Sequence, residues 1–191
     1  MNLKEHTACF TGGRPKSLYP TYAYAESRRK DYNHMIEKIY QHLVHLYDEY
    51  HIYRFISGGA QGFDQLAFQA VARLKQLHPD VQNIVYVPFK HQESKWMNNG
   101  LFSQEEYRNM LSQADEIKIC TPQLDPRTSN YGLVARALYY RNECMCNDSS
   151  IVIGQYPDDT WINPATKGGT AACLRYASTI GIAMQIHDFR L

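Results

Sequence analysis

One short segment joins an apolar run to a glycine turn and then to the start of a helical pattern: residues 55–64, FISGGAQGFD. Glycine tolerates positive φ and lets a ligand approach the main chain closely. The unpaired N–H groups and positive dipole end of a following helix favour an anion, most often a phosphate. The segment therefore predicts a strand–turn–helix unit with an anion-binding turn in the middle.

Apolar runs of this kind alternate along the chain with longer segments whose apolar residues recur every three or four positions. The strand-like runs are residues 8–11, 54–57, 84–87, 116–120, 151–154 and 182–186. The helix-like segments are residues 27–50, 63–77, 104–113, 133–147 and 171–180. Continuously apolar strands between helices are typical of a parallel sheet covered on both faces. We predict an α/β fold, a single Rossmann-like three-layer domain over residues 1–191, with a mostly parallel sheet of about six strands.

Size and charge narrow the classes of protein. A chain of 191 residues suits one domain, and its net charge of +1 gives no general reason to bind nucleic acid or an anionic membrane. No apolar segment approaches the roughly 20 residues that span a bilayer, and the N-terminus lacks an apolar signal region. The five cysteines show no zinc-ligand spacing. We expect a reduced, cytoplasmic protein without a metal.

Two further glycine turns accompany the first, at residues 11–15 (TGGRP) and 167–170 (KGGT). Ligands of open α/β sheets bind beyond the carboxyl ends of the strands, where all three turns belong. We expect Gly58 and Gly59, like Gly168 and Gly169, to lie at helix starts and to offer free N–H groups. The alternative is that the glycines only make tight connections. The dinucleotide fingerprint GxGxxG and the P-loop are absent, which disfavours a standard dehydrogenase or a P-loop ATPase.

Several polar residues near these turns have two alternative roles each, one in ligand binding and one in the structure of the protein. Arg14 either reaches a phosphate or lies on the surface, and Pro15 beside it argues against a helix start there. Asp64 either interacts with the helix dipole or accepts a hydrogen bond from a ribose hydroxyl or a base. Arg141 either contacts the ligand or makes a salt bridge. Thr170 most simply caps the last helix, which is compatible with donating to a phosphate.

The loop after residue 87 adds two more candidates, Gln92 and Trp96. Gln92 either meets a base edge or binds the backbone, and Trp96 either stacks on a base or, as we favour, packs in the interior. The predicted ligand-binding residues are Thr11, Gly12, Gly13, Arg14, Ser57, Gly58, Gly59, Gly62, Asp64, Gln92, Trp96, Arg141, Asn142, Gly168, Gly169 and Thr170.

These motifs occur in a fixed order: TGGRP, then SGGAQGFD at 57–64, then Pro88-Phe89 with Gln92 and Trp96, then Arg141-Asn142, then KGGT. Together they resemble the YpsA-like branch of the SLOG superfamily. That resemblance implies a Rossmann-like domain that binds a nucleotide or a nucleotide-derived ligand, such as ADP-ribose, NAD or a nucleoside phosphate. Many relatives associate through their helices, so the resemblance also allows a homo-oligomer and leaves the oligomeric state open.

More distant similarity to LOG phosphoribohydrolases and to the DNA-uptake protein DprA supplies two alternative functions. LOG enzymes carry a PGGxGTxxE turn, but here the sequence reads KGGTAAC and the catalytic glutamate is absent. If the protein were such an N-glycosidic hydrolase, Asp64 would be the best available carboxylate. DprA-like binding of single-stranded DNA would use the basic run at residues 28–30, but the near-neutral net charge disfavours it. We therefore expect a cytoplasmic nucleotide sensor.

Overall fold

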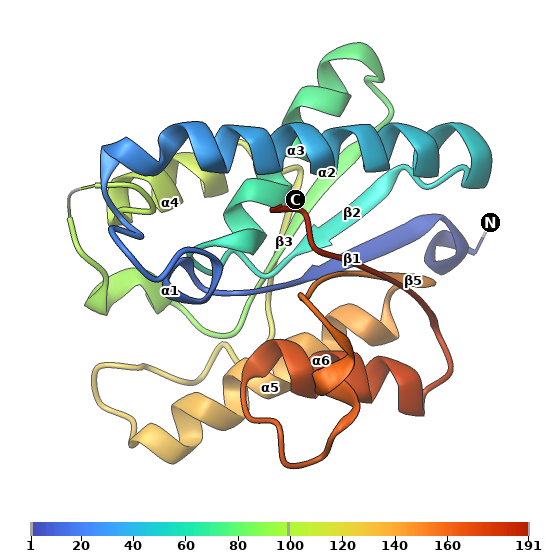
Figure 1. Ribbon diagram of the computed structural model, residues 1–191. Helices are drawn as coiled ribbons and strands as arrows, with labels where there is room; N and C mark the ends of the chain where they lie inside the picture. Colours follow the sequence, from blue (N-terminus) through green and yellow to red (C-terminus); the bar gives the residue numbers. More distant parts are fainter. Residues whose placement is uncertain (1, 99, 191) are drawn as a thin grey trace.

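Six parallel strands form one sheet, in the order β4-β3-β2-β1-β5-β6, in a computed structural model that describes residues 2–98 and 100–190 (Figure 1). The predicted α/β, Rossmann-like three-layer fold is confirmed. The strands are β1 (Thr7–Thr11), β2 (Arg54–Ser57), β3 (Gln82–Val87), β4 (Glu116–Ile119), β5 (Ile151–Gln155) and β6 (Ala183–His187).

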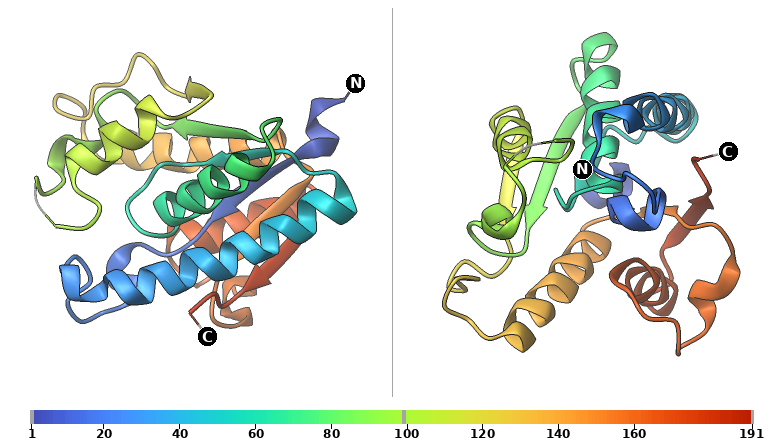
Figure 2. Two further views of the ribbon diagram at one scale, coloured as in Figure 1. Left: turned by 90° about the horizontal axis from the view of Figure 1, so that it is seen from above. Right: turned by 60° about the vertical axis from the view of Figure 1, so that its left-hand side comes forward.

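Helices cover both faces of the sheet (Figures 1 and 2). One face carries α2 (Arg29–Tyr50), α3 (Phe63–Leu77) and α4 (Gln104–Ser112), and the other carries α5 (Tyr131–Asn147) and α6 (Gly169–Thr179). Successive strand residues point to opposite faces, so each strand supplies both cores. The strand residues in the α2–α3 core include Phe10, Phe55 and Ile153, and those in the α5–α6 core include Cys9, Ile56 and Val152.

The parallel register aligns these residues across the sheet. Cys9 of β1 is paired with Ile56 of β2 on one side and with Val152 of β5 on the other. All three are almost fully buried. Burial on both faces explains why the central strands are continuously apolar rather than alternating.

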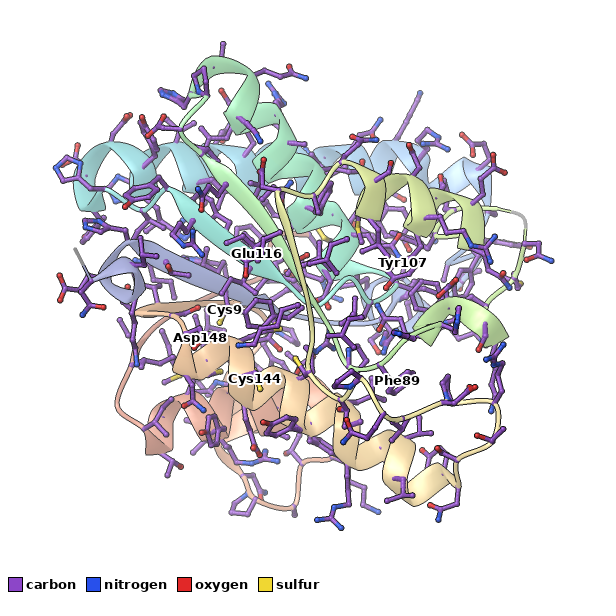
Figure 3. The ribbon with its side chains drawn as sticks, turned by 180° about the vertical axis from the view of Figure 1, so that it is seen from behind. Cys9, Phe89, Tyr107, Glu116, Cys144 and Asp148 are labelled. Atoms are coloured by element: carbon purple, nitrogen blue, oxygen red, sulfur yellow. The ribbon has the colours of Figure 1, made fainter. Side chains whose placement is uncertain are left out.

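The α5 helix is also tied to the far edge of the sheet. Asp148, directly after α5, accepts hydrogen bonds from the Tyr86 hydroxyl of β3 (2.7 Å) and from Lys118 Nζ of β4 (2.8 Å) (Figure 3). These contacts hold α5 across β3, so that its N-terminal part extends past the carboxyl ends of the strands.

One local prediction is wrong. A short helix, α1 (Pro15–Leu18), begins at Pro15, where proline was expected to prevent a helix start. Proline occupies the first helical position, where its missing N–H costs no hydrogen bond and its fixed φ suits the helix. The remaining predicted elements are all present, with their ends shifted by at most about two residues, which is within the usual uncertainty of helix and strand boundaries.

The chain changes direction across the sheet at β1, which has β2 on one side and β5 on the other. Such a switch point leaves a crevice beyond the carboxyl ends of the two diverging strands. Among the described residues, no helix is both long enough and apolar enough to cross a membrane.

Candidate functional site

A cavity of about 510 Å³ lies at this switch point; we call it the switch-point cavity. It is bounded by the loop after β1, the first turn of α6, one face of α5 and the loop between β5 and α6. The predicted site residues that line it are Thr11, Gly12, Gly13, Arg14, Asp64, Arg141, Asn142, Gly168, Gly169 and Thr170. Two of the three glycine turns therefore face one cavity at one edge of the sheet.

A buried ion pair forms part of the cavity wall. Arg141 and Asp64 are 5% and 6% exposed, and Arg141 Nη1 lies 3.7 Å from Asp64 Oδ2. Arg141 Nη1 also donates to the carbonyl oxygens of Gly58 and Tyr86, and the Ala60 N–H donates to Asp64 Oδ2 at 3.2 Å. Both readings weighed for Arg141 are thus compatible, because it makes a salt bridge and also lines the cavity.

Burial raises the pKa of Asp64, whereas the nearby positive charges of Arg141 and Arg14 act in the opposite direction. The Asp64 carboxylate is already hydrogen-bonded on its protein side. Its place in the cavity lining leaves it able to accept a hydrogen bond from a hydroxyl or an N–H group of a ligand.

The turn at residues 57–62 does not present its glycines to the cavity. A Cβ at position 58 would overlap the Arg141 guanidinium and the Asp64 carboxylate, so these side chains fill the space over Gly58. The expectation that Gly58 and Gly59 open the helix is wrong. Gly62, at φ +96°, is the N-cap of α3. The Phe63 N–H at the start of α3 donates to Gly13 O at 3.1 Å, so the protein itself occupies this helix end.

Three other predicted residues also lie outside the cavity lining. Ser57 is fully buried, and its Oγ has no hydrogen-bond partner among the described residues. Gln92 Nε2 donates to the Tyr107 hydroxyl at 2.7 Å, and the Trp96 ring packs edge-on against Tyr107 with centroids 5.0 Å apart. These contacts give Gln92 and Trp96 a packing partner in α4.

The first turn of α6 is the helix end that opens into the cavity. Its N-cap is Gly168, at φ +118°, which has no side chain with which to cap the first-turn amides. The prediction that Thr170 caps the helix is therefore wrong, since Thr170 lies inside the first turn. Asn142 connects this turn to the buried pair: its Oδ1 accepts from Arg141 Nε at 2.9 Å, and its Nδ2 lies 3.4 Å from Gly169 O. Free first-turn amides and the helix dipole favour an anion here.

Positive charge predominates in the cavity lining, with four basic side chains, Arg14, Arg141, Lys167 and Arg190, against the single carboxylate of Asp64 among the described lining residues. Arg190 is paired with Asp188. The Arg14 side chain makes no hydrogen bond or ion pair with any described residue, and the same holds for Lys167. Arg14 is solvent-exposed. Desolvation by the surrounding protein lowers the pKa of its guanidinium, whereas the negative charge of Asp64 raises it, and Arg14 stays a cation.

Sequence reasoning missed an aromatic wall formed by Tyr131 and Tyr139 of α5. Tyr131 is 87% exposed, so it is available to a ligand. A signal was present, because residues 131, 135, 138, 139 and 142 recur at helical spacing and share a face with the predicted Asn142. Arg190 and Tyr156 were missed as well, and no local pattern distinguishes them.

Comparison with known proteins assigns the family. The profile of the YpsA family, described as the YspA SLOG family, matches residues 9–177. The chain belongs to the YpsA family of SLOG proteins. The resemblance seen in the glycine motifs is thereby confirmed, and the matched range includes every predicted site residue.

Two curated relatives are similar in sequence. The SPbeta prophage-derived protein YoqJ of Bacillus subtilis is 36% identical over 138 residues, which cover 70% of this chain and 74% of YoqJ. The UPF0398 protein BH1768 of Halalkalibacterium halodurans is 36% identical over 67 residues, which cover 35% of this chain and 34% of that protein. The second similarity thus spans about a third of the relative.

Among solved structures, the DNA processing protein A (DprA) of Streptococcus pneumoniae aligns with 98% of this chain and 61% of its own. The TM-score is 0.40 and the sequence identity is 12%. A likeness at this level is too weak to carry an argument about function.

Proposed function

We propose that the protein binds a nucleotide or a nucleotide-derived ligand in the switch-point cavity. The observation that carries this proposal is the convergence of Arg14, Lys167 and the uncapped start of α6 on one cavity. Unpaired cations and free amides around a concave site favour an anionic group, of which a phosphate is the commonest. The cavity volume of about 510 Å³ lies within the range of small-molecule sites.

The rest of the lining suggests how such a ligand would lie. A phosphate or pyrophosphate would occupy the start of α6, within reach of Arg14 and Lys167. The Asp64 carboxylate would accept from a ribose hydroxyl, because a phosphate beside it would be repelled. The exposed rings of Tyr131 and Tyr139 would offer flat surfaces to the base.

A matched pair of variants tests the proposal. Binding of ADP-ribose, NAD and nucleoside monophosphates would be measured by thermal shift and calorimetry. We expect at least one of them to raise the melting temperature. Since the Arg14 side chain makes no hydrogen bond or ion pair with a described residue, Arg14→Gln should leave the fold intact and weaken binding about 10- to 100-fold, as expected for the loss of a charge-assisted hydrogen bond of about 1.5–3 kcal/mol.

The control is Arg136→Gln on α5, which removes the same charge from an exposed side chain outside the switch-point cavity. It should bind like the unaltered protein. A cooperative melt that no member of the panel shifts would contradict the proposal. Equal losses of affinity in Arg14→Gln and Arg136→Gln would contradict the proposal as well, because the loss would then come from the change in net charge rather than from the position of Arg14.

Asp64 gives one specific reason to keep an N-glycosidic hydrolase as a second candidate, since it is the carboxylate in the described cavity lining. Incubation with nucleoside monophosphates, followed by detection of free base, tests this activity. Base release that Asp64→Asn leaves unchanged would exclude the role for Asp64.

The DprA-like alternative has less support from the surface charges. Arg28 is paired with Asp31, and Arg29 with Glu26, so the basic run that would contact single-stranded DNA is largely neutralised. DNA binding and homo-oligomer formation stay predictions, to be checked by gel shift at low salt and by light scattering.

A further inference from the structure

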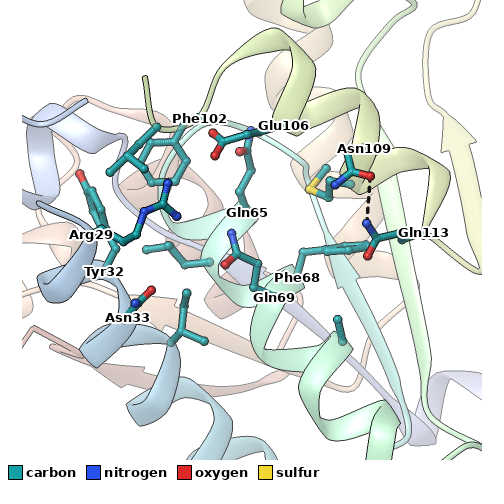
Figure 4. A pocket seen from close by; sticks show the side chains of 15 residues that line it. Arg29, Tyr32, Asn33, Gln65, Phe68, Gln69, Phe102, Glu106, Asn109 and Gln113 are labelled. Atoms are coloured by element: carbon teal, nitrogen blue, oxygen red, sulfur yellow. Dashed lines mark hydrogen bonds between the residues drawn. The ribbon is translucent and has the colours of Figure 1, made fainter. Parts of the chain in front are cut away.

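A second cavity, of about 300 Å³, lies among α2, α3 and α4, on the face of the sheet that these helices cover (Figure 4). We call it the helix cavity. None of its lining residues lines the switch-point cavity. The residues at 59–62 separate the two cavities, because Gln65 donates to Gly59 O on one side while Ala60 and Asp64 line the other.

Carboxamide side chains from all three helices dominate the polar lining of the helix cavity: Asn33, Gln65, Gln69, Asn109 and Gln113. In Figure 4 the Gln65 and Gln69 side chains extend from α3 into the space between α2 and α4. Each carboxamide carries an acceptor oxygen beside a two-hydrogen donor. Such a lining can form hydrogen bonds with a ligand that carries both a donor and an acceptor.

Gln65 shows that this lining is not fully satisfied by the protein. Gln65 is 96% buried, and its Nε2 donates to Gly59 O at 3.3 Å. Its Oε1 has no hydrogen-bond partner among the described residues. This oxygen is not among the fully buried unpartnered atoms, so it keeps solvent access and can accept a hydrogen bond from a ligand. Gln69 and Asn33 are exposed, and their side chains make no hydrogen bond to described residues, so both carboxamides are accessible to a ligand.

The two charged side chains in the described lining of the helix cavity, Arg29 and Glu106, already have hydrogen-bond partners. Arg29 donates to the Glu26 carboxylate, and Glu106 Oε2 accepts from the Ser103 N–H at 3.1 Å within the capping box of α4. The lining therefore offers no uncommitted charge to a phosphate. Apolar groups between the amides, including Phe68 and Phe102, suit a flat uncharged ring.

We propose that the helix cavity is a second small-molecule site, for an uncharged planar ligand with adjacent hydrogen-bond donor and acceptor. An aminopurine base and an aromatic primary carboxamide share this chemistry, and paired contacts between Gln or Asn and the amino edge of adenine follow the same geometry. The site is independent of the nucleotide function proposed above.

Adenine and nicotinamide are the probes that distinguish the two ligand sources. The readout is a nitrogen–proton NMR correlation spectrum, in which the NH₂ signals of the lining carboxamides are observed directly. We expect one or both probes to shift the signals of Gln69, Asn109 and Gln113. Inorganic phosphate should leave those signals in place while shifting backbone signals of residues 12–14 and 168–170.

Two variants on the same helix make the matched comparison. Gln69→Ala removes a carboxamide that lines the cavity, whereas Gln76→Ala removes one two turns away on α3 that is also exposed but lies outside the cavity. Gln69→Ala should weaken probe binding about fivefold, the value for one neutral hydrogen bond, with Gln76→Ala unchanged. Asn33→Ala provides a second test on α2.

Three results would overturn the proposal. The first is that neither probe shifts the carboxamide signals at concentrations near its solubility limit. The second is that the shifts occur only at residues 12–14 and 168–170. The third is that Gln69→Ala and Asn33→Ala bind the probes as tightly as Gln76→Ala. Loss of nucleotide binding at the switch-point cavity would leave all these readouts unaffected, so the two proposals fail separately.

Discussion

Arg141 lies where α5, β3 and the loop after β2 meet, and it is the partner of a buried carboxylate. Removing one member of a buried ion pair leaves the other charge desolvated and unpaired. Arg141→Met should therefore lower the free energy of unfolding by about 3–5 kcal/mol in urea denaturation. The double variant Arg141→Met/Asp64→Asn should recover part of that loss.

Arg127→Met is the contrasting change, because the Arg127–Asp125 pair lies at the surface, where solvent screens ion pairs. We expect its urea midpoint to stay close to that of the unaltered protein. If Arg141→Met proved equally mild, the buried pair would not carry the stability assigned to it.

Replacing Gly62 by alanine should lower the free energy of unfolding. Gly62 has φ +96°, and a Cβ there would lie 2.5 Å from Gly13 O, a backbone atom of the cavity loop. Positive φ alone costs a non-glycine residue about 1–3 kcal/mol, and this contact adds to the cost. Gly181→Ala, at φ +72° with open space around the Cβ, should be clearly milder when both are unfolded in urea.

At the scale of elements, the loop between β5 and α6 carries Lys167 and Gly168 to the cavity, and one side chain holds it in shape. Arg175 of α6 donates to the carbonyl oxygens of Trp161 (2.7 Å), Asn163 (3.2 Å) and Thr166 (3.1 Å). Arg175→Met should lower stability by about 1–3 kcal/mol. It should also speed tryptic cleavage after Lys167.

The Arg136→Met variant on α5 is the reference for that experiment, since it removes an arginine that makes no hydrogen bond or ion pair to described residues. Its cleavage rate after Lys167 should be unchanged. An Arg175→Met protein cleaved no faster at this position would show that other contacts hold the loop.

Among the elements, local patterns predicted the strands and the main helices well, because three-to-four-residue periodicity and continuous apolar runs depend only on neighbouring residues. The ends of elements were harder. Pro15 starts α1, and the N-cap of α3 is Gly62 rather than Gly58 or Gly59. Both outcomes depend on where the turn meets a neighbouring segment, as in the contact between Phe63 N and Gly13 O.

At the scale of the whole molecule, α2 meets the C-terminal strand through a pair of histidines. His42 and His187 have ring centroids 4.7 Å apart. Burial, followed by the charge of His187, lowers the pKa of His42 to about 4, from about 6.5 in an unfolded chain. The folded state disfavours protonation, so this contribution to stability is complete above pH 6.5 and is lost as the pH falls toward 4.

We therefore expect the free energy of unfolding to decrease between pH 7 and pH 4, and His42→Phe to make that decrease smaller. Urea denaturation at a series of pH values is the measurement. His34→Phe, which alters an exposed histidine of the same helix, should keep the original slope. Identical slopes for His42→Phe and the unaltered protein would contradict the assignment.

The order of apolar runs, helical periods and glycine turns was enough to predict a parallel sheet covered on both faces, the resemblance to the YpsA family and the edge of the sheet where the switch-point cavity lies, because these features depend on residues close together in the sequence. Tertiary packing alone decided which turns open into the cavity. The Asp64–Arg141 pair fills the space over Gly58, and the start of α6 stays uncovered. Asp64 and Arg141 are far apart in the sequence and meet only when the cores on both faces of the sheet form. No local sequence pattern predicts such a contact.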